Sequence, residues 1–472
     1  MIKKFFSSLS NRKVFAILFI VSVLAGGSSI AYLTHVADTS DTKMAREFPT
    51  ASDTMPGEFA VLTVNMVDHG VFSAATTSPY APNMWRTPGY SVFLAPFYAL
   101  TGSFYPALFA QILLVFLTTL LVFKMARRFM SNVWALALSV LYIVLPTTLL
   151  SVATIMNETL YTLVLMGAIY LFFFSEVKSM YLKFALTGFL LALAAYIKPG
   201  SLYILFFFLP AYFALYLPWK EISRKHLYAA LLMVVVFVGT ITPWCIRNQT
   251  VLGSGHFAST SAFQIFRHNA TQFYEAYHDV PNIEARYALQ DMAGIPRGAV
   301  PVDPKYSDVM KKVAFQVIFA HPFSYAKFHL LTFIPFFASS GVIDYERFVY
   351  VMLPEFDAAE EPSLIQAINP FSFPTLMVVL GNHGWTLVEN SAWALVTLLA
   401  LIGLLYGKNV RMARMLFAIV LYFAVVTGPI AHARYRAPIE PLLLIGAFAT
   451  VVYGLEKRGW RALLTKVKKP QQ

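Results

Sequence analysis

The chain has 472 residues, of which 58% are hydrophobic and 13% charged, and its mean hydropathy is +0.62. Soluble globular proteins are far less apolar, so this composition excludes a typical soluble protein and predicts a polytopic membrane protein. The formal net charge is +12, and the single cysteine, Cys245, excludes both an internal disulfide framework and a multi-cysteine metal site.

The first apolar run covers residues 14–34 and follows a basic start with Lys3, Lys4, Arg12 and Lys13. A secretory signal is the alternative interpretation. The run of about 20 residues is longer than the 7 to 15 residues of a signal-peptide core, however, and no A-x-A-like cleavage site follows it. We therefore expect an uncleaved transmembrane helix, with the N-terminus in the cytoplasm because basic residues precede it.

Apolar runs of membrane-spanning length recur along the chain, since a bilayer core needs about 20 apolar residues for each helical crossing. Together with the first run they predict an all-α bundle of about 10 to 12 transmembrane helices. The further crossings are expected at residues 104–123, 132–150, 158–175, 181–197, 200–217, 227–244, 391–406, 412–429 and 437–454.

The segments that would share one membrane face are basic. With the N-terminus, they hold 21 of the 36 Lys and Arg but only three of the 24 acidic residues. An excess of Lys and Arg marks the cytoplasmic side, so the C-terminal tail 455–472 is expected there too, and the net charge of +12 is attributed to topology rather than to nucleic-acid binding. These segments are residues 124–129, 176–183, 219–226, 407–414 and 456–469.

One apolar stretch, residues 322–342, does not fit this alternation, because both of its flanks should lie outside. It is either re-entrant or interfacial, or it crosses and returns through residues 371–381. The total is then ten or twelve helices. The acidic stretch 344–362 lies between the two candidates and favours the outside, and therefore ten, although acidic residues are weak topological signals.

Two long segments remain outside, residues 35–103 and 245–390, and neither shows the pattern of an independent domain. We treat residues 1–472 as one integral membrane domain with substantial extracytoplasmic loops, the first of which contains candidate interfacial helices. Large outer loops indicate work at the outer membrane face, whereas a transporter more often has short loops and polar residues in mid-helix.

Five cations stand at predicted outer membrane boundaries, where the positive-inside rule gives no reason for them. Each could snorkel to water on its own, but five from four loops together suggest a cradle for an anion. Arginine suits phosphate because its planar fork donates two parallel hydrogen bonds, and a phosphate in an apolar groove is naturally a lipid head group. The five are Arg86, Lys198, Arg247, Arg434 and Arg436.

Six stretches, in order along the chain, resemble motifs of the GT-C membrane glycosyltransferases, in the branch of the protein O-mannosyltransferases, lipid A aminoarabinose transferase and bacterial glycosyltransferase family 39 proteins. Ser91 stands in place of the family's second proline, Lys198 in place of a more frequent arginine, and the family's acidic pair in the first loop is not adjacent here. The stretches are "GEFAVLTVNMVDHGVFS" (57–73), "RTPGYSVFLAPFYALTG" (86–102), "PTTLLSVATIMNETLYTLVL" (146–165), "ALAAYIKPGSLYILF" (192–206), "TPWCIRNQTVLGSGHFAST" (242–260) and "HARYRAPIEPLL" (432–443).

This resemblance implies an inverting glycosyltransferase of the plasma membrane that moves a sugar from a polyprenyl-phosphate donor to a hydroxyl of a lipid, glycan or protein at the extracytoplasmic face. The general base would be a carboxylate of the first loop. By spacing, Glu58 matches best and Asp53 next, with Asp41 and Asp68 in the same loop. The alternative for Glu58 is a stabilising charge in a first helical turn.

The five cations would share the donor phosphate, and Tyr90, Glu158 and Asn248 are candidates for orienting the substrate. Glu158 has an equally simple alternative role as an acid at a helix N-terminus. The outer His and Asp residues lack metal-ligand spacing, so no required metal or cofactor is expected. Two other classes stay open: a transporter or flippase of lipid-linked sugars, and a non-catalytic protein of cell-envelope assembly.

Overall fold

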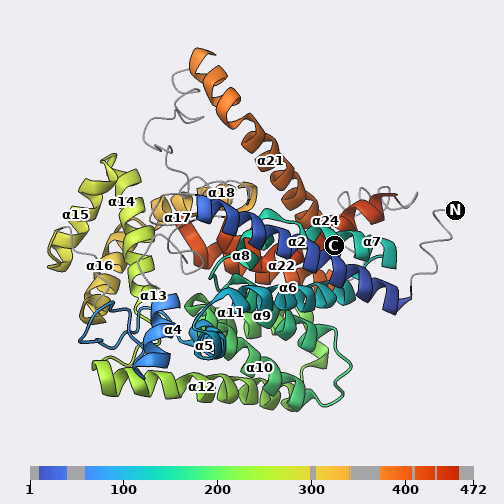
Figure 1. The fold of residues 1–472 in the computed structure, drawn as a ribbon, viewed down its shortest axis with the longest axis horizontal. Coiled ribbons are helices and arrows are strands. Elements are labelled where there is room, and N and C mark those ends of the chain that lie inside the picture. The colour runs from blue at the N-terminus through green and yellow to red at the C-terminus, as the bar shows by residue number, and fades with distance from the viewer. Residues whose placement is uncertain are drawn as a thin grey trace.

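A computed structural model describes residues 10–39, 59–297, 304–339, 341, 373–406, 410–430 and 433–455, all of them in helices, turns and connecting loops (Figure 1). The predicted all-α architecture is confirmed. The long apolar helices pack into one bundle, and shorter helices gather beyond one of its ends, on the left in Figure 1.

Eight helices in the described part of the chain are long and apolar enough to cross a membrane. Their ends differ by a few residues from those expected from the sequence. They are α2 (Asn11–Thr39), α6 (Tyr105–Ala126), α10 (Met180–Ile197), α11 with its flanking turns (Pro199–Tyr216), α12 (Arg224–Leu252), part of α21 (Leu387–Leu405 of Phe373–Tyr406), α22 with the turn after it (Arg411–Ile430) and α24 with the turns before it (Ala433–Leu455).

Two further predicted crossings are also helical. Residues 132–150 lie in α7 (Asn132–Ile143) and α8 (Pro146–Ala153), which meet at 51° and count as a ninth span if taken together. Pro146 explains the break, because proline lacks the N–H of a continuing helix and suits a first turn. The tenth is α9 (Glu158–Phe173), an apolar helix of 16 residues. Each of the ten predicted runs therefore corresponds to a helix or a bent pair.

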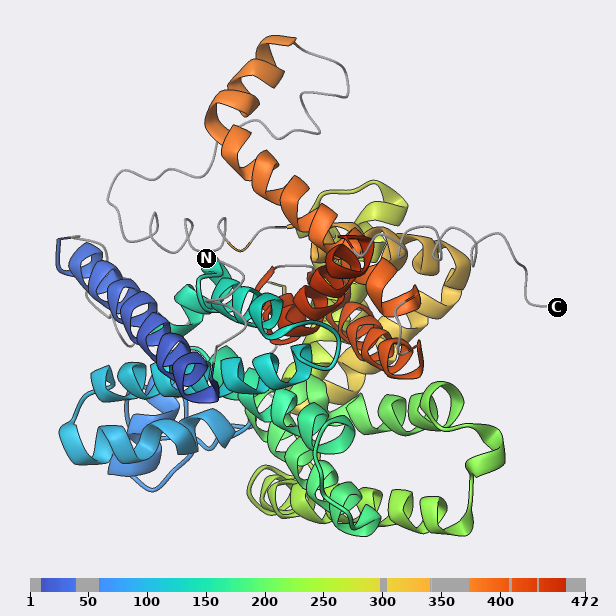
Figure 2. The ribbon, with the colours of Figure 1, turned by 90° about the vertical axis from the view of Figure 1, so that its right-hand side faces the viewer.

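The ambiguous stretch 322–342 forms two short helices, α17 (Pro322–Leu331) and α18 (Phe333–Ala338), which are not among the candidate spans. The described part of 371–381 belongs to the long helix α21, so it is not a separate crossing. In Figure 2, this helix rises obliquely away from the bundle. The described residues thus contain eight candidate spans, or nine with the bent pair, and neither part of this stretch adds another. The acidic stretch 344–362 lies outside the described residues.

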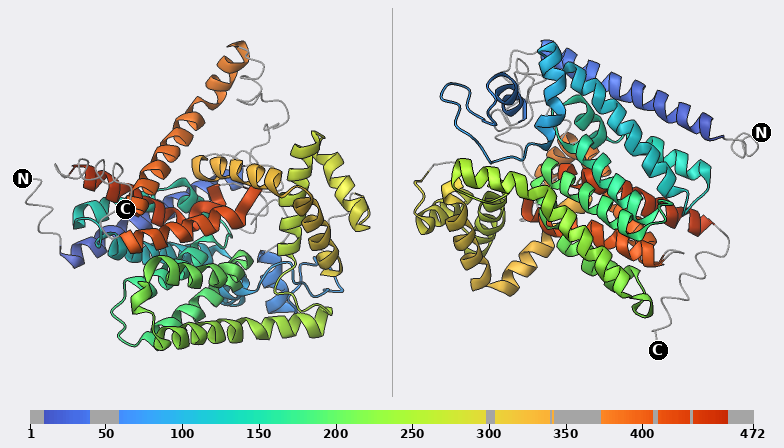
Figure 3. Two further views of the ribbon diagram at one scale, coloured as in Figure 1. Left: turned by 180° about the vertical axis from the view of Figure 1, so that it is seen from behind. Right: turned by 90° about the horizontal axis from the view of Figure 1, so that it is seen from below.

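The helices beyond the end of the bundle come from both predicted outer segments. They gather at one side of the molecule (Figure 3). Buried residues of three of them and of a π-helical turn at Gln264–Ala270 form a small core of their own. The first segment contributes α4 (Phe59–Asp68) and α5 (Gly89–Thr101), and the second contributes α13 (Thr260–Phe263), α14 (Thr271–His278), α15 (Asn282–Ala293) and α16 (Ser307–Ala320). The small core contains Ala262, Phe266, Leu289, Met310, Val313 and Ala314.

Small residues let the long helices approach closely, as is usual between membrane helices. A Cβ atom on Gly188 of α10 would lie 2.6 Å from the carbonyl oxygen of Met233 in α12, and one on Gly446 of α24 would lie 2.9 Å from that of Ala400 in α21. Backbone contact at these points fixes how the spans sit against one another, and with them the side chains at their ends.

Candidate functional site

The C-terminus of α10 is the point where several chain segments meet. The last carbonyl groups of a helix have no partner within it and need other donors. Here Thr87 Oγ1 donates to the carbonyl of Ala195 at 3.4 Å, and Asn157 Nδ2 donates to that of Ile197 at 2.8 Å. The next residue is Lys198. The end of α10 thus brings together the segments containing Arg86, Glu158 and Lys198.

The stretch that follows Arg86 in the sequence fixes its position against α10. Gly89, the first residue of α5, lies so close to α10 that an added Cβ would be 2.6 Å from the carbonyl oxygen of Tyr196. No residue with a side chain fits there without movement. The Arg86 guanidinium lies over the Phe59 ring, with its central carbon 5.7 Å from the ring centre.

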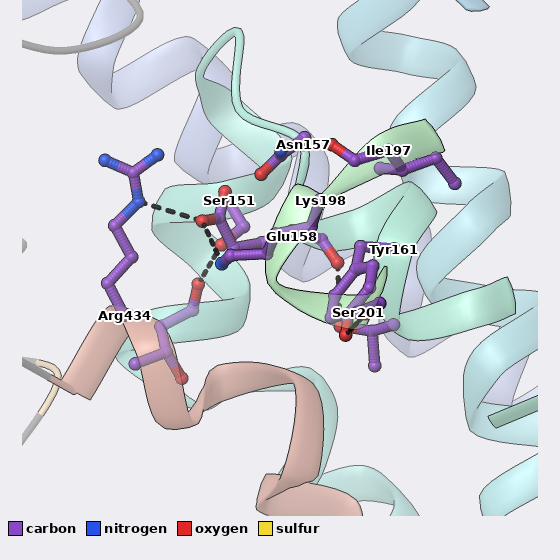
Figure 4. Close-up of polar contacts among 10 residues, drawn as sticks. Ser151, Asn157, Glu158, Tyr161, Ile197, Lys198, Ser201 and Arg434 are labelled. Carbon is purple, nitrogen blue, oxygen red and sulfur yellow. Dashed lines mark hydrogen bonds and ion pairs between the residues drawn. The ribbon is translucent and has the colours of Figure 1, made fainter. Parts of the chain in front are cut away.

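Glu158 is the centre of the site. It is the first residue of α9, and its side chain is 2% exposed. Lys198 Nζ lies 3.2 Å from its Oε1, and Arg434 Nε lies 2.8 Å from the same oxygen (Figure 4). The two cations are 18% and 21% exposed, so both reach the surface while the carboxylate does not. We call the three residues the Glu158 cluster, and the end of the bundle where they lie the cluster end.

The Glu158 cluster holds more positive than negative charge. Burial lowers the pKa of Lys198, the negative charge of Glu158 opposes this, and the positive charges of Arg434 and Arg86 lower it further. Arg86 is therefore near enough to act on Lys198. The lysine ammonium also lies 5.0 Å from the centre of the Tyr435 ring. Glu158 Oε2 is buried without a hydrogen-bond partner among the described residues.

Arg436, expected to join the other cations, lies elsewhere. Its side chain is fully buried, with Nε 3.3 Å from Oε1 of Glu440, which is also fully buried. Its Nη1 donates to the carbonyl of Phe336 at 2.8 Å, and its guanidinium covers the Trp393 ring at 4.1 Å. Thr147 Oγ1 donates to the other Glu440 oxygen at 2.5 Å. The structure therefore gives Arg436 a place in a closed ion pair within the bundle.

Arg247 contacts the backbone of the Arg86 stretch. Its Nη1 donates to the carbonyl of Asn83 and to Oδ1 of Asn248, both at 2.9 Å, while its guanidinium covers the Trp244 ring at 4.7 Å. Asn248 is buried and donates to the carbonyl of His256 at 2.8 Å. Through these contacts Arg247 and Asn248 connect the Arg86 stretch with the loop that contains His256.

The stretch before Arg86 is also held by the second outer segment. The N–H of Ser259 donates to the carbonyl of Met84 at 3.0 Å, and Thr260 Oγ1 donates to that of Trp85 at 2.7 Å. The indole of Trp85 packs edge-on against Phe263. The short helix α13 thus fixes the backbone on which Arg86 stands.

Tyr90 is fully buried and belongs to a polar network that sequence reasoning missed. Its hydroxyl donates to Gln111 Oε1 at 2.9 Å, and Thr159 Oγ1 donates to the same oxygen at 2.8 Å. Gln111 Nε2 donates to the carbonyls of Val152 and Thr154 at 3.0 and 2.9 Å. The network holds the turn that leads into Glu158. A lone glutamine inside an apolar run, where a polar group needs partners, was the available signal.

The predicted carboxylate bases Glu58 and Asp53 lie outside the described residues, as does Asp41. Phe59, which contacts Arg86, directly follows Glu58 in the sequence. Asp68 is described, and its Oδ2 accepts a hydrogen bond from the Tyr98 hydroxyl at 3.0 Å. Among the described residues, no three His, Cys, Asp or Glu side chains are grouped so that they could hold a metal ion.

Comparison with known proteins finds similarity among solved structures. No family model and no curated protein matches the sequence. The structure is similar to the oligosaccharyltransferase of Archaeoglobus fulgidus in its apo form, with a TM-score of 0.47 and 13% identity over 97% of this chain and 52% of that one. The chain thus spans about half the length of that enzyme.

Two further structures are similar. One is the archaeal oligosaccharyltransferase AglB from Archaeoglobus fulgidus in complex with an inhibitory peptide and a dolichol-phosphate, with a TM-score of 0.45 and 13% identity over 95% of this chain and 52% of that one. The other is ArnT from Cupriavidus metallidurans bound to undecaprenyl phosphate, with a TM-score of 0.38 and 14% identity over 92% of this chain and 78% of that one. The similarity to these GT-C membrane proteins is one of fold.

Proposed function

We propose that the protein is a membrane glycosyltransferase that takes a sugar from a polyprenyl-phosphate donor and transfers it to an acceptor hydroxyl at the extracytoplasmic face of the plasma membrane. The observation behind this proposal is the Glu158 cluster, in which Lys198 and Arg434 converge on one buried carboxylate with Arg86 nearby. The sugar and the acceptor are left open.

The charge balance of the cluster favours an anionic ligand. Among the described residues, Glu158 is one carboxylate that meets two partly exposed cations, Lys198 and Arg434. In Figure 4, Arg434 turns only its Nε toward Glu158, and its terminal nitrogens point the other way. A guanidinium fork and an ammonium group suit phosphate oxygens, and a phosphate held at the end of an apolar bundle fits the head of a lipid.

The proposed chemistry is a single displacement at the anomeric carbon. The acceptor oxygen forms a bond to that carbon as the bond to the phosphate oxygen breaks, and the acceptor proton goes to a carboxylate base. Negative charge develops on the departing polyprenyl phosphate, where Lys198, Arg434 and Arg86 stabilise it. Such a displacement inverts the anomeric configuration. No metal or cofactor takes part in this scheme.

Glu58 is the proposed base, with Asp53 as the alternative, because its neighbour Phe59 contacts Arg86. A base acts only within hydrogen-bond reach of the proton that it removes. Glu158 is proposed as a positioning residue that aligns Lys198 and Arg434, since its bonded oxygen is shared by both. Arg247 is proposed to hold the Arg86 stretch, and Arg436 to hold the bundle, instead of binding phosphate.

The test is reconstitution of the full chain in lipid nanodiscs with a panel of polyprenyl-phosphate sugars and acceptors, with release of polyprenyl phosphate as the readout. We expect release with at least one donor, and loss of release in Glu58→Gln with donor binding retained. The matched control is Arg297→Gln, which removes an exposed cation in the turn that follows α15. Movement of an intact lipid-linked sugar across a vesicle membrane without release would contradict the proposal and indicate a transporter.

A further inference from the structure

Helices α17 and α18 lie outside the candidate spans, yet they present apolar side chains to the surroundings. Phe323 is 90% exposed, and Leu330, Leu331 and Ile334 are 62%, 56% and 63% exposed. Their spacing places them along one side of the two consecutive helices. A contiguous apolar surface of this kind is costly in water and marks a contact surface.

The opposite side of these helices is fixed to the bundle by three contacts. His329 Nε2 donates to the carbonyl of Val425 at 3.1 Å, near the end of α22. The carbonyl of Phe337 accepts a hydrogen bond from Thr397 of α21 at 3.0 Å, and that of Phe336 accepts one from Arg436 at 2.8 Å. Arg436 stands near the start of its own candidate span, Ala433–Leu455, whereas Thr397 lies near the middle of the candidate span Leu387–Leu405.

The exposed side of α17 and α18 continues a surface that faces lipid. Val425, next to His329, is 48% exposed, and Val426 is 39% exposed, both within the candidate span Arg411–Ile430. Leu395 and Leu398 of the neighbouring span in α21 are each 56% exposed. Membrane-spanning helices expose such residues because acyl chains cover them. The apolar side of α17 and α18 extends this surface.

The one charged residue on these two helices is also consistent with a membrane interface. Lys327 is exposed on α17, between Phe323 and Leu330. A lysine can lay its hydrocarbon stem along an apolar surface while its ammonium reaches the head-group region. The outer helix α15 differs, because it exposes Glu284 and Asp291, as expected of a helix in water.

We propose that α17 and α18 form an interfacial segment that inserts into the membrane leaflet at the cluster end, with Phe323, Leu330, Leu331 and Ile334 among the acyl chains. The occupant of this surface is bilayer lipid, because the surface is continuous with that of the spans. The segment would then anchor helices α13 to α16, with their small core, at the membrane surface.

The test uses the single native cysteine. In a Cys245→Ser background, an environment-sensitive fluorophore is attached at Phe323→Cys or Ile334→Cys, and the full chain is placed in vesicles containing lipids spin-labelled near the head group or deep in the acyl chain. The matched controls are Val238→Cys in the α12 span and Ile283→Cys on α15, because both native side chains are 46% exposed. We expect the spin-labelled lipids to quench the fluorophore at 323 and 334 as strongly as at 238. At 323 and 334 the label near the head group should quench more than the label deep in the acyl chain. The fluorophore at 283 should be quenched only by aqueous iodide.

Two outcomes would overturn the proposal. Iodide quenching at 323 and 334 equal to that at 283 would place the surface in water. Protection from both quenchers, with cross-linking between copies, would make it a dimer contact. Should either cysteine variant fail to fold, Leu331→Cys offers a third exposed position on the same surface. None of these results depends on transferase activity.

Discussion

Two arginines only two residues apart, Arg434 and Arg436, meet carboxylates in opposite ways. Arg436 and Glu440 are both fully buried, one cation to one carboxylate. Arg434 is 21% exposed and shares the buried Glu158 with Lys198, two cations to one carboxylate. The first arrangement is closed and neutral, as a structural pair must be within a bundle. The second places two partly exposed cations at one buried carboxylate. Charge balance and exposure, more than residue type, are the basis on which we propose different roles for the two arginines.

The largest effect is expected from breaking the closed pair. Arg436→Met leaves Glu440 buried without its cation, and loss of one partner of a buried pair costs about 3–5 kcal/mol. We expect a marked fall in thermal stability in detergent, measured by differential scanning fluorimetry.

The double variant Arg436→Met with Glu440→Leu sharpens this prediction. Apolar replacement of a buried ion pair is often neutral or stabilising, so most of the lost stability should return. The control is Asp291→Asn, which breaks an exposed pair with Arg297 and should leave stability unchanged. An Arg436→Met protein as stable as the wild type would remove the distinction between the closed pair and the Glu158 cluster.

Removing a cation from the Glu158 cluster should affect ligand binding more than stability. Lys198→Gln or Arg434→Gln removes one cation while the other still faces Glu158. A hydrogen bond to a charged group contributes about 1.5–3 kcal/mol, so the affinity for polyprenyl phosphate should fall roughly 10- to 100-fold. Binding is measured with polyprenyl phosphate itself, and the melting temperature is recorded alongside. A large loss of stability with unchanged affinity would show that this cluster, too, is only structural.

The position of Arg86 relative to Lys198 can be tested at Gly89. In Gly89→Ala the new Cβ lies 2.6 Å from the Tyr196 carbonyl oxygen, so α5 must move away from α10. Overpacking of this kind costs about 1–3 kcal/mol, and weaker binding of polyprenyl phosphate should accompany the loss. Gly167→Ala is the matched control, because nothing lies within 4 Å of its added Cβ. Equal behaviour of the two variants would mean that the α5–α10 contact does not position Arg86.

Much of this fold could be predicted from the sequence. Each of the eight candidate spans in the described residues, and the bent pair, appears in the sequence as an apolar run, because membrane helices must be long and apolar. The association of Arg86, Lys198 and Arg434 could be suspected because each is a cation without a topological reason. The separation of Arg434 from Arg436 was also foreseeable: neighbours two apart in a helix differ by about 200° and face opposite sides. Glu440, four residues after Arg436, was the visible partner for it.

Other parts of the site required the structure. The sequence shows Arg247 as a boundary cation like the others, and nothing in it reveals that the guanidinium bonds to the carbonyl of Asn83, far away in the chain. Asn157 and Gln111 bond to backbone carbonyls of other helices, and such contacts leave no periodic pattern. Polar groups within apolar segments can be flagged from sequence, but their partners depend on how the helices pack.

The smallest and most gradual expected effect is the pH dependence of polyprenyl phosphate binding, and it concerns the Glu158 cluster alone. Lys198 lies between the candidate spans Met180–Ile197 and Pro199–Tyr216, and burial, against the opposing effect of Glu158, lowers its pKa from the ordinary 10.5. Its proton is needed to bind phosphate, so affinity for polyprenyl phosphate should fall as the pH rises through the lowered pKa, before exposed lysines lose their charge. Stability should change in the opposite direction. Between the lowered pKa and 10.5 the unfolded chain binds more protons at this group than the folded one, so the contribution of Lys198 to stability rises with pH. Lys198→Arg retains its charge and should keep its affinity across this range. The measurement is the dissociation constant of polyprenyl phosphate from pH 7 to alkaline pH in both proteins, and identical profiles would exclude Lys198 as the titrating phosphate ligand.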